Sequence, residues 1–151
     1  MTFSPLKLNL FLFFKLPAAF ISGVRVKVMN KTMCLVTVKH RWINQNPFRS
    51  MYFAVQAMAA ELSTGVLVMY GVEKSKQKIA MLVINQKATF FKKAVGLISF
   101  TSQDGDLVAE AVREAIITGE GQTFWMKSVG IDQKGDQVSE MFFEWSIKVK
   151  K

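Results

Sequence analysis

Glu61 is the one charged residue among the twenty from Met51 to Tyr70. An ionised carboxylate is costly to remove from water, so a buried one is normally paired, hydrogen-bonded or kept protonated by a raised pKa. A carboxyl group retained in such surroundings can serve as a general base or as a nucleophile. Chemistry at Glu61 is therefore one interpretation, and a structural pairing with a lysine or arginine is the other.

The residues around Glu61 predict a helix over residues 51–70 that is buried on nearly all sides. This stretch contains no proline and mixes small side chains with large apolar ones, as a helix inside a core does. About twenty apolar residues are also enough to cross a bilayer. Gln56, Glu61 and Ser63 make a bilayer costly, and no later segment repeats the apolar pattern. We therefore expect a core helix.

Other catalytic chemistries lack the residues that they need. Cys34, the only cysteine, lies in a strand-like run, and we expect it to be a small core side chain. His40, the only histidine, ends a predicted strand far from the helix, so no Ser-His-Asp or Cys-His arrangement is evident. We predict no metal site, because no set of metal ligands is present. A lone cysteine is compatible with a reducing compartment, and we expect the protein to be cytoplasmic.

The chain is strongly basic, with 20 lysines and arginines against 11 acidic residues and a formal net charge of +9. Such a balance suits a partner that carries negative charge. The basic residues occur in small separate groups, and no nucleic-acid-binding motif is present. We expect no nucleic acid partner, and we interpret the groups as solvated turns, as contacts to ligand phosphates or as contacts to a membrane surface.

The N-terminal segment from Leu6 to Ile21 has some features of a secretion signal. Lys15 interrupts its apolar run, and Pro17 is followed at once by an alternating strand pattern. We therefore expect residues 1–20 to form a short amphipathic helical lead-in that packs on the edge of the domain.

The rest of the chain alternates between strand and helix patterns. Apolar residues at helical spacing, with Asp104 or Asp106 to cap and Gly119 to terminate, predict an amphipathic helix over 104–118. Alternation with a period of two predicts strands over 23–29, 32–40, 79–85 joined to 88–91, 94–101, 123–131 and 137–149. Because few helices intervene, the strands should pair antiparallel. We predict one α+β domain over 1–151, a curved antiparallel sheet around the apolar helix at 51–70.

This order resembles the hotdog fold of thioesterases and acyl-CoA-handling proteins. The segment NPFRSMYFAVQAMAAELSTG carries the resemblance, since Asn46 opens the loop before the helix and Glu61 follows fifteen residues later. In the phenylacetate-type hotdog thioesterases, a loop asparagine, a histidine-glycine-glycine turn and a helical acid stand at similar separations. Tyr52, Phe53 and Ala54 occupy the turn positions here. The chain is most similar to an uncharacterised thioesterase-like branch that lacks this turn.

The resemblance implies hydrolysis of an acyl-CoA thioester, with coenzyme A as part of the substrate and no other cofactor. Glu61 would activate water or attack the thioester, and backbone N–H groups near Tyr52 and Phe53 would stabilise the oxyanion. Asn46 would hold the loop or the attacking water. The other candidate substrate contacts are Thr64, Arg49, Lys92 and Lys93, the three basic residues as partners of the coenzyme A phosphates.

The distance along the helix adds a condition to this mechanism. Nine residues at 1.5 Å rise separate Tyr52 from Glu61 by about 13.5 Å, which is too far for both to contact one carbonyl group. Two protomers must then build each site, so we predict a homodimer or a dimer of dimers.

Two alternatives remain open. The bulky Tyr52 and Phe53 at the start of the helix favour a non-catalytic acyl-CoA or lipid-binding protein of the same fold. The basic balance and the apolar run from Leu6 to Phe14 would also suit attachment to an anionic membrane surface, although we do not expect a membrane as the partner.

Overall fold

The computed structural model describes residues 3–151. Two short helices, α1 (Pro5–Lys15) and α2 (Pro17–Ile21), precede a hairpin of β1 (Arg25–Met29) and β2 (Cys34–Lys39). A 3-10 turn, η1 (Trp42–Asn44), leads to the long helix α3 (Phe53–Ser75). The chain then continues through β3 (Ile79–Phe90), β4 (Leu97–Ser102), α4 (Gly105–Thr118), β5 (Gln122–Ile131) and β6 (Gln137–Val149).

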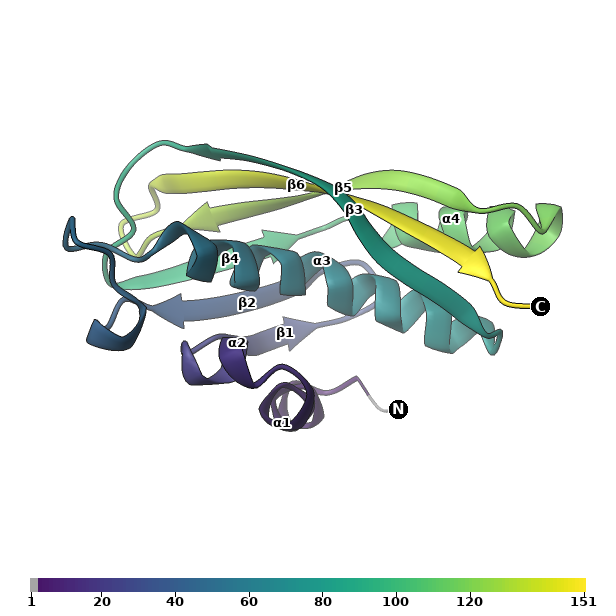
Figure 1. The fold of residues 1–151 in the computed structure, drawn as a ribbon, viewed down its shortest axis with the longest axis horizontal. Coiled ribbons are helices and arrows are strands. Elements are labelled where there is room, and N and C mark those ends of the chain that lie inside the picture. The colour runs from purple at the N-terminus through teal and green to yellow at the C-terminus, as the bar shows by residue number, and fades with distance from the viewer. Residues whose placement is uncertain (1–2) are drawn as a thin grey trace.

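The strands form one six-stranded sheet in the order β1-β2-β4-β5-β6-β3, and every neighbouring pair is antiparallel. The sheet curves around α3, and α4 packs against α3 and against β5 and β6 (Figure 1). The predicted curved antiparallel sheet around an apolar helix is therefore confirmed. The two segments predicted at 79–85 and 88–91 do join into one strand, β3.

The central helix begins at Phe53 rather than at residue 51, and among the central helix and the strands two boundaries differ from the prediction by three residues or more. The central helix ends at Ser75 rather than at residue 70, because Gly71 stays helical and a further turn follows it. Lys76, whose φ is 56°, ends the helix. The strand predicted from residue 94 begins only at Leu97, since Gly96 has φ of 75° and breaks the extended backbone.

The N-terminal segment forms two helices, because Pro17 begins a new helix directly after the end of α1. Leu8 and Leu12 of α1 are fully buried. The Asn9 side chain accepts a hydrogen bond from the Val26 N–H at 2.8 Å and donates one to the Val26 carbonyl at 2.9 Å. These bonds occupy backbone groups at the free edge of β1, so α1 packs on the edge of the sheet as predicted.

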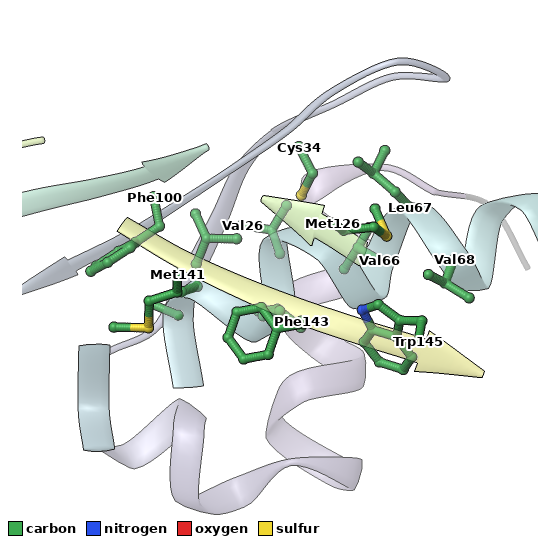
Figure 2. Close-up of a cluster of buried hydrophobic side chains, with 14 of the residues drawn as sticks. Val26, Cys34, Val66, Leu67, Val68, Phe100, Met126, Met141, Phe143 and Trp145 are labelled. Atoms are coloured by element: carbon green, nitrogen blue, oxygen red, sulfur yellow. The ribbon is translucent and has the colours of Figure 1, made fainter. Parts of the chain in front are cut away.

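The core lies between α3 and the inner face of the sheet. Figure 2 shows Met126, Phe143 and Trp145 from the sheet meeting Val66 and Val68 of the helix. Within residues 3–151, α3 is the one helix long and apolar enough to cross a bilayer by length and composition. Here its apolar side chains fill the centre of the sheet, as expected of a core helix.

Two polar contacts fix α3 against the sheet. The Trp145 indole N–H donates to the Thr64 hydroxyl at 3.0 Å, and that hydroxyl donates to the Glu61 carbonyl at 2.8 Å. At the preceding position of α3, the Ser63 hydroxyl is 2.8 Å from the Ser128 hydroxyl of β5. Both helix residues are fully buried, so these bonds set the rotation and the height of α3 within the sheet.

Replacement of Thr64 by valine tests this anchoring. Thr64→Val preserves the shape of the side chain but leaves the Trp145 N–H without its acceptor, so the free energy of unfolding should fall by about 1–3 kcal/mol in urea denaturation. Thr37→Val is the matched control, because Thr37 is also buried and its hydroxyl bonds to no described residue. Equal losses at the two positions would show that the Thr64 hydroxyl does not anchor the helix.

Candidate active site

The Glu61 carboxyl lies beside a hollow between α3 and the junction of α1 and α2. A Cβ atom placed on Gly65 would lie 3.2 Å from Glu61 Oε1 and 3.3 Å from the Trp145 ring, so the carboxyl rests over Gly65 next to that ring. The hollow, here called the Glu61 hollow, has a volume of about 330 Å³ and is lined by Lys15, Leu16, Pro17, Ala18, Ala19, Met58, Glu61 and Leu62. The N-terminal segment therefore forms one wall of the cavity that contains the acid.

Burial raises the pKa of the Glu61 carboxyl from the usual 4.5 to about 7. Loss of water is the whole cause, since among residues 3–151 no hydrogen bond or ion pair reaches the Glu61 carboxyl oxygens. The structural pairing with a lysine or arginine is therefore absent from the part of the chain that the structure describes. Near neutral pH the carboxyl is divided between its protonated and ionised forms, as suits proton transfer.

Asn46 organises the loop that precedes α3. Its side-chain oxygen accepts from the Phe48 N–H at 2.9 Å and from the Ser50 N–H at 3.2 Å. Its amide nitrogen donates to the Ser50 hydroxyl at 3.0 Å and to the Met51 carbonyl at 3.3 Å. Of the two roles predicted for Asn46, these bonds fulfil that of holding the loop.

The start of α3 carries free backbone donors. The Tyr52 N–H donates to the Asn44 carbonyl at 2.8 Å, and the N–H groups of Val55 and Gln56 donate to the Tyr52 carbonyl. The N–H groups of Phe53 and Ala54 have no acceptor among the described residues, and no side chain caps the helix. The free donors at the start of the helix are therefore those of Phe53 and Ala54, because the Asn44 carbonyl occupies the Tyr52 N–H. The predicted role of this region in stabilising an oxyanion stays a prediction.

Phe53, the first of these two residues, lines a second and larger hollow, the entrance hollow, of about 600 Å³. It brings together most of the site residues predicted from the sequence and adds others, Gln56 among them. Its lining includes Asn46, Tyr52, Phe53, Gln56, Phe90, Phe91, Lys92 and Lys93. Glu61 is not among them. The eight residues from Phe53 to Glu61 correspond to about 12 Å along the helix, so one chain holds the donors and the acid apart.

Gln56 is the site residue that sequence reasoning missed. Its side chain is 4% exposed, it lines the entrance hollow, and its side-chain oxygen has no hydrogen-bond partner among residues 3–151. A buried amide oxygen without a partner is costly and points to a missing ligand or water. The sequence signal was weak, since Gln56 reads only as one polar residue in an apolar helix.

The remaining predicted contacts differ in how free they are to meet a substrate. Lys92 is paired with Asp132 at 2.8 Å and with Asp136 at 2.9 Å, so its charge is already neutralised. Lys93 donates to the Phe48 carbonyl at 3.2 Å and forms no ion pair with a described residue.

Arg49 and Thr64 are two further predicted contacts, and neither lines the entrance hollow. Arg49 is exposed beside it, with φ of 61°. Thr64 is fully buried, and its hydroxyl donates to the Glu61 backbone carbonyl and accepts from the Trp145 indole N–H. Its contact with a substrate stays a prediction.

The other potential nucleophile and a third hollow lie apart from this chemistry. Cys34 is fully buried, and burial raises the pKa of its thiol to about 12, so it is a core side chain as expected. A hollow of about 460 Å³ between α3 and α4 has a largely apolar wall around Leu67, Tyr70 and Val112. It does not contain Glu61 or the free donors, so we assign it no part in the reaction.

The family model of a domain of unknown function, DUF4442, matches residues 8–147. The chain belongs to the DUF4442 family. No curated protein matches this DUF4442 chain.

Solved structures share the fold of the DUF4442 chain at low sequence identity. A Pseudomonas aeruginosa protein described as of unknown function and a probable thioesterase has a TM-score of 0.82 and 21% identity, over 97% of each chain. A putative thioesterase from Shewanella oneidensis has a TM-score of 0.79 and 9% identity, again over 97% of each chain. A Haemophilus influenzae thioesterase has a TM-score of 0.72 and 11% identity, over 99% of this chain and 93% of its own. The predicted hotdog, thioesterase-like fold is confirmed.

The raised pKa of Glu61 predicts a pH-dependent stability. The folded carboxyl keeps its proton up to about pH 7, whereas the unfolded one releases it near pH 4.5. The native state therefore loses stability as the pH rises between these values. Glu61→Gln cannot ionise, so its free energy of unfolding relative to the native sequence should rise from pH 4.5 to pH 8 by up to about 3 kcal/mol in denaturant titrations.

Glu120→Gln, the same change at an exposed turn, is the control and should show no such rise. A constant difference between Glu61→Gln and the native protein at both pH values would mean that the carboxyl is solvated or paired in solution.

Proposed function

We propose that this protein hydrolyses acyl-CoA thioesters at a site shared by two protomers, with Glu61 as general base or nucleophile. The observation that carries the proposal is the partly buried Glu61 carboxyl, which has no partner among the described residues and a pKa of about 7, at the edge of the Glu61 hollow. Solved structures with the same fold include proteins described as thioesterases, which supports thioester hydrolysis as the class of reaction.

Glu61 acts on the attacking group. As a base, the carboxylate takes a proton from a water molecule while the water oxygen bonds to the thioester carbonyl carbon. The carbon–sulfur bond then breaks, and the leaving thiolate takes the proton back from the Glu61 carboxyl. The products are a carboxylic acid and the thiol of coenzyme A. As a nucleophile, the Glu61 carboxylate attacks the carbonyl carbon, the carbon–sulfur bond breaks, and coenzyme A leaves as a thiolate that takes a proton from solvent. Water then hydrolyses the acyl anhydride, which releases the carboxylic acid and regenerates the Glu61 carboxylate.

The start of α3 acts on the carbonyl oxygen. Negative charge develops there as the tetrahedral intermediate forms, and the N–H groups of Phe53 and Ala54 lie at the positive end of the helix dipole. The buried Gln56 amide, which lines the entrance hollow, gives a further polar contact to the substrate or to the attacking water.

The two halves of the site come from different protomers in this proposal. Helix geometry supports this, because about 12 Å separates the Phe53 donor from Glu61 in one chain. A free sheet edge supports it as well. β3 is paired only on its β6 side, it is twelve residues long, and Leu82 and Ile84 on it are exposed, so it offers an unpaired edge to a second protomer.

The substrate fits the character of the entrance hollow. Phe90, Phe91 and the ring of Phe53 give it apolar walls for an acyl chain, and Arg49 and Lys93 beside it suit coenzyme A phosphates. Lys92 is a weaker candidate for binding the phosphates, because Asp132 and Asp136 already form ion pairs with it.

One observation favours the alternative of acyl-CoA or lipid binding without turnover. The rings of Tyr52 and Phe53 stack edge to face at 5.0 Å beside the free donors, where the better-known enzymes of this fold carry a histidine and a glycine. These rings narrow the approach to the oxyanion position. A bound thioester held out of reach of the donors would persist without hydrolysis.

A panel of acyl-CoA thioesters distinguishes turnover from binding. We expect release of free thiol, with kcat/KM rising with pH through a midpoint near 7, because only the ionised Glu61 accepts a proton. Glu61→Gln should lower kcat by about 10²–10⁴-fold, whereas Glu120→Gln should leave it unchanged. Thermal shifts with acyl-CoA but no thiol release would assign the protein to the binding alternative, and equal rates for native and Glu61→Gln protein would remove Glu61 from the mechanism.

Phe53→Pro tests the backbone donor. Phe53 is the first residue of α3, where proline is favoured, and the extended Tyr52 before it, with ψ of 134°, accepts a following proline. The variant removes one oxyanion donor without breaking the helix, so kcat should fall by about 10²–10³-fold. Phe53→Ala, which loses the ring but retains the N–H, is the control for the side chain.

Mixing the two defective proteins then tests the shared site. In a heterodimer of Glu61→Gln with Phe53→Pro, one of the two sites receives an intact acid and an intact helix start, and the other receives neither. Random exchange of protomers should restore about a quarter of native activity, since half of the dimers are mixed. If one chain supplied both groups, the mixture would remain as inactive as its components.

A further inference from the structure

The positive charge of this protein is concentrated in its first sixty residues. They contain eight lysines and arginines and no aspartate or glutamate, and Glu61 is the first acidic residue of the chain. Residues 61–151 contain the other twelve basic residues and all eleven acidic ones. The net charge is therefore +8 before Glu61 and +1 from Glu61 onward, although the first part is the shorter.

The same part of the chain exposes large apolar side chains on a helix face. Leu6, Leu10, Phe13 and Phe14 of α1 are 81%, 57%, 51% and 67% exposed. Their spacing of i, i+4, i+7 and i+8 places them on one face. The buried Leu8 and Leu12 lie on the opposite face, against the core. Helix α1 is thus apolar on both sides, and the fold covers only one.

Neighbouring elements extend this surface. Ile21 at the end of α2 is 65% exposed, and Trp42 and Ile43 of η1 are 80% and 53% exposed. The Asn44 amide ties η1 to α2, since its nitrogen donates to the Ser22 carbonyl at 2.9 Å. Figure 1 shows α1 and α2 together beside β1, at the edge of the fold away from the free strand β3. We name the exposed set Leu6, Leu10, Phe13, Phe14, Ile21, Trp42 and Ile43 the N-terminal apolar patch.

Exposed cations come from the same elements as the patch and from the hairpin against which α1 packs. Lys7 and Lys15 are exposed on α1, Lys27 on β1, Lys31 in the hairpin turn and Arg41 immediately before Trp42. An apolar helix face with basic residues and aromatic rings is the composition of a segment that lies in the plane of a lipid surface.

We propose that the N-terminal apolar patch docks this protein on an anionic lipid bilayer. The apolar side chains enter the boundary between headgroups and acyl chains, the cations remain among the lipid headgroups, and Trp42 lies at the interface. Charge argues against a second copy as the occupant, because two such patches would bring the exposed cations around one patch against the like charges around the other. The proposal reverses the expectation from the sequence that no membrane surface is involved, and it does not depend on thioester turnover.

Vesicle flotation with the full chain tests the docking. We expect binding to vesicles of phosphatidylcholine mixed with phosphatidylglycerol, weaker binding to phosphatidylcholine alone, and a loss of affinity as salt rises. Trp42 gives a second readout. It is far more exposed than Trp125 at 36% or Trp145 at 4%, so tryptophan emission should shift to the blue on binding, and Trp42→Phe should abolish most of the shift.

Matched variants distinguish an effect of the N-terminal apolar patch from an effect of any change in surface charge or surface hydrophobicity. Phe14→Glu should weaken vesicle affinity by at least about tenfold, whereas Ile117→Glu, the same new charge at a 69% exposed site on α4, should not. Lys7→Gln combined with Lys15→Gln should weaken it about 25-fold at low salt, as lysines near an anionic surface contribute about fivefold each. Lys148→Gln with Lys150→Gln removes the same charge at the C-terminus and should have little effect.

Three outcomes would overturn the proposal. The native protein would fail to bind phosphatidylglycerol vesicles, or Phe14→Glu and Ile117→Glu would bind equally well. In the third, Phe14→Glu would reduce the oligomeric state measured by light scattering while vesicle binding stayed unchanged, which would make the patch a contact between copies. Circular dichroism of each variant is the control for folding. We expect all of them to remain folded, because every substituted side chain is exposed.

Discussion

The enclosure of α3 by the curved sheet is the constraint on which the rest of this structure depends. A helix surrounded in this way can carry polar side chains only where their bonds are satisfied inside the fold. Ser63 and Thr64 meet this condition, since each hydroxyl donates to a carbonyl one turn back and also contacts the sheet, at Ser128 and Trp145. These contacts fix the helix, and the position of every other residue on α3 follows from them.

Glu61 does not meet the same condition, and its properties follow from that failure. It lies where the wall of the helix is completed by the junction of α1 and α2 rather than by the sheet. The carboxyl loses water there without gaining a partner among the described residues. Its pKa rises, and ionisation above neutral pH costs stability. At the start of α3, the N–H groups of Phe53 and Ala54 and the side-chain oxygen of Gln56 likewise have no hydrogen-bond partner among the described residues. Both unsatisfied sets lie beside hollows, and a rigid helix keeps them apart.

The N-terminal segment has one face packed against the core and one face exposed on the surface. Its inner face, with Leu8, Leu12 and Ala19, closes the core and forms a wall of the Glu61 hollow. Its outer face remains apolar and is flanked by cations. Asn9 also makes two specific bonds to Val26 at the edge of the sheet, so this segment is part of the fold.

The sequence by itself determined the order of the elements, the enclosed helix and the unusual status of Glu61. Periodicity of apolar residues is a local property, and one acid in a long apolar run is visible without coordinates. Only the tertiary structure decided that Asn46 is occupied by its own loop, that Asp132 and Asp136 neutralise Lys92, and that Gln56 has an unpaired oxygen. It alone showed that Phe53 and Glu61 line separate hollows. Each of these depends on which distant segments pack together, and no local pattern specifies that packing.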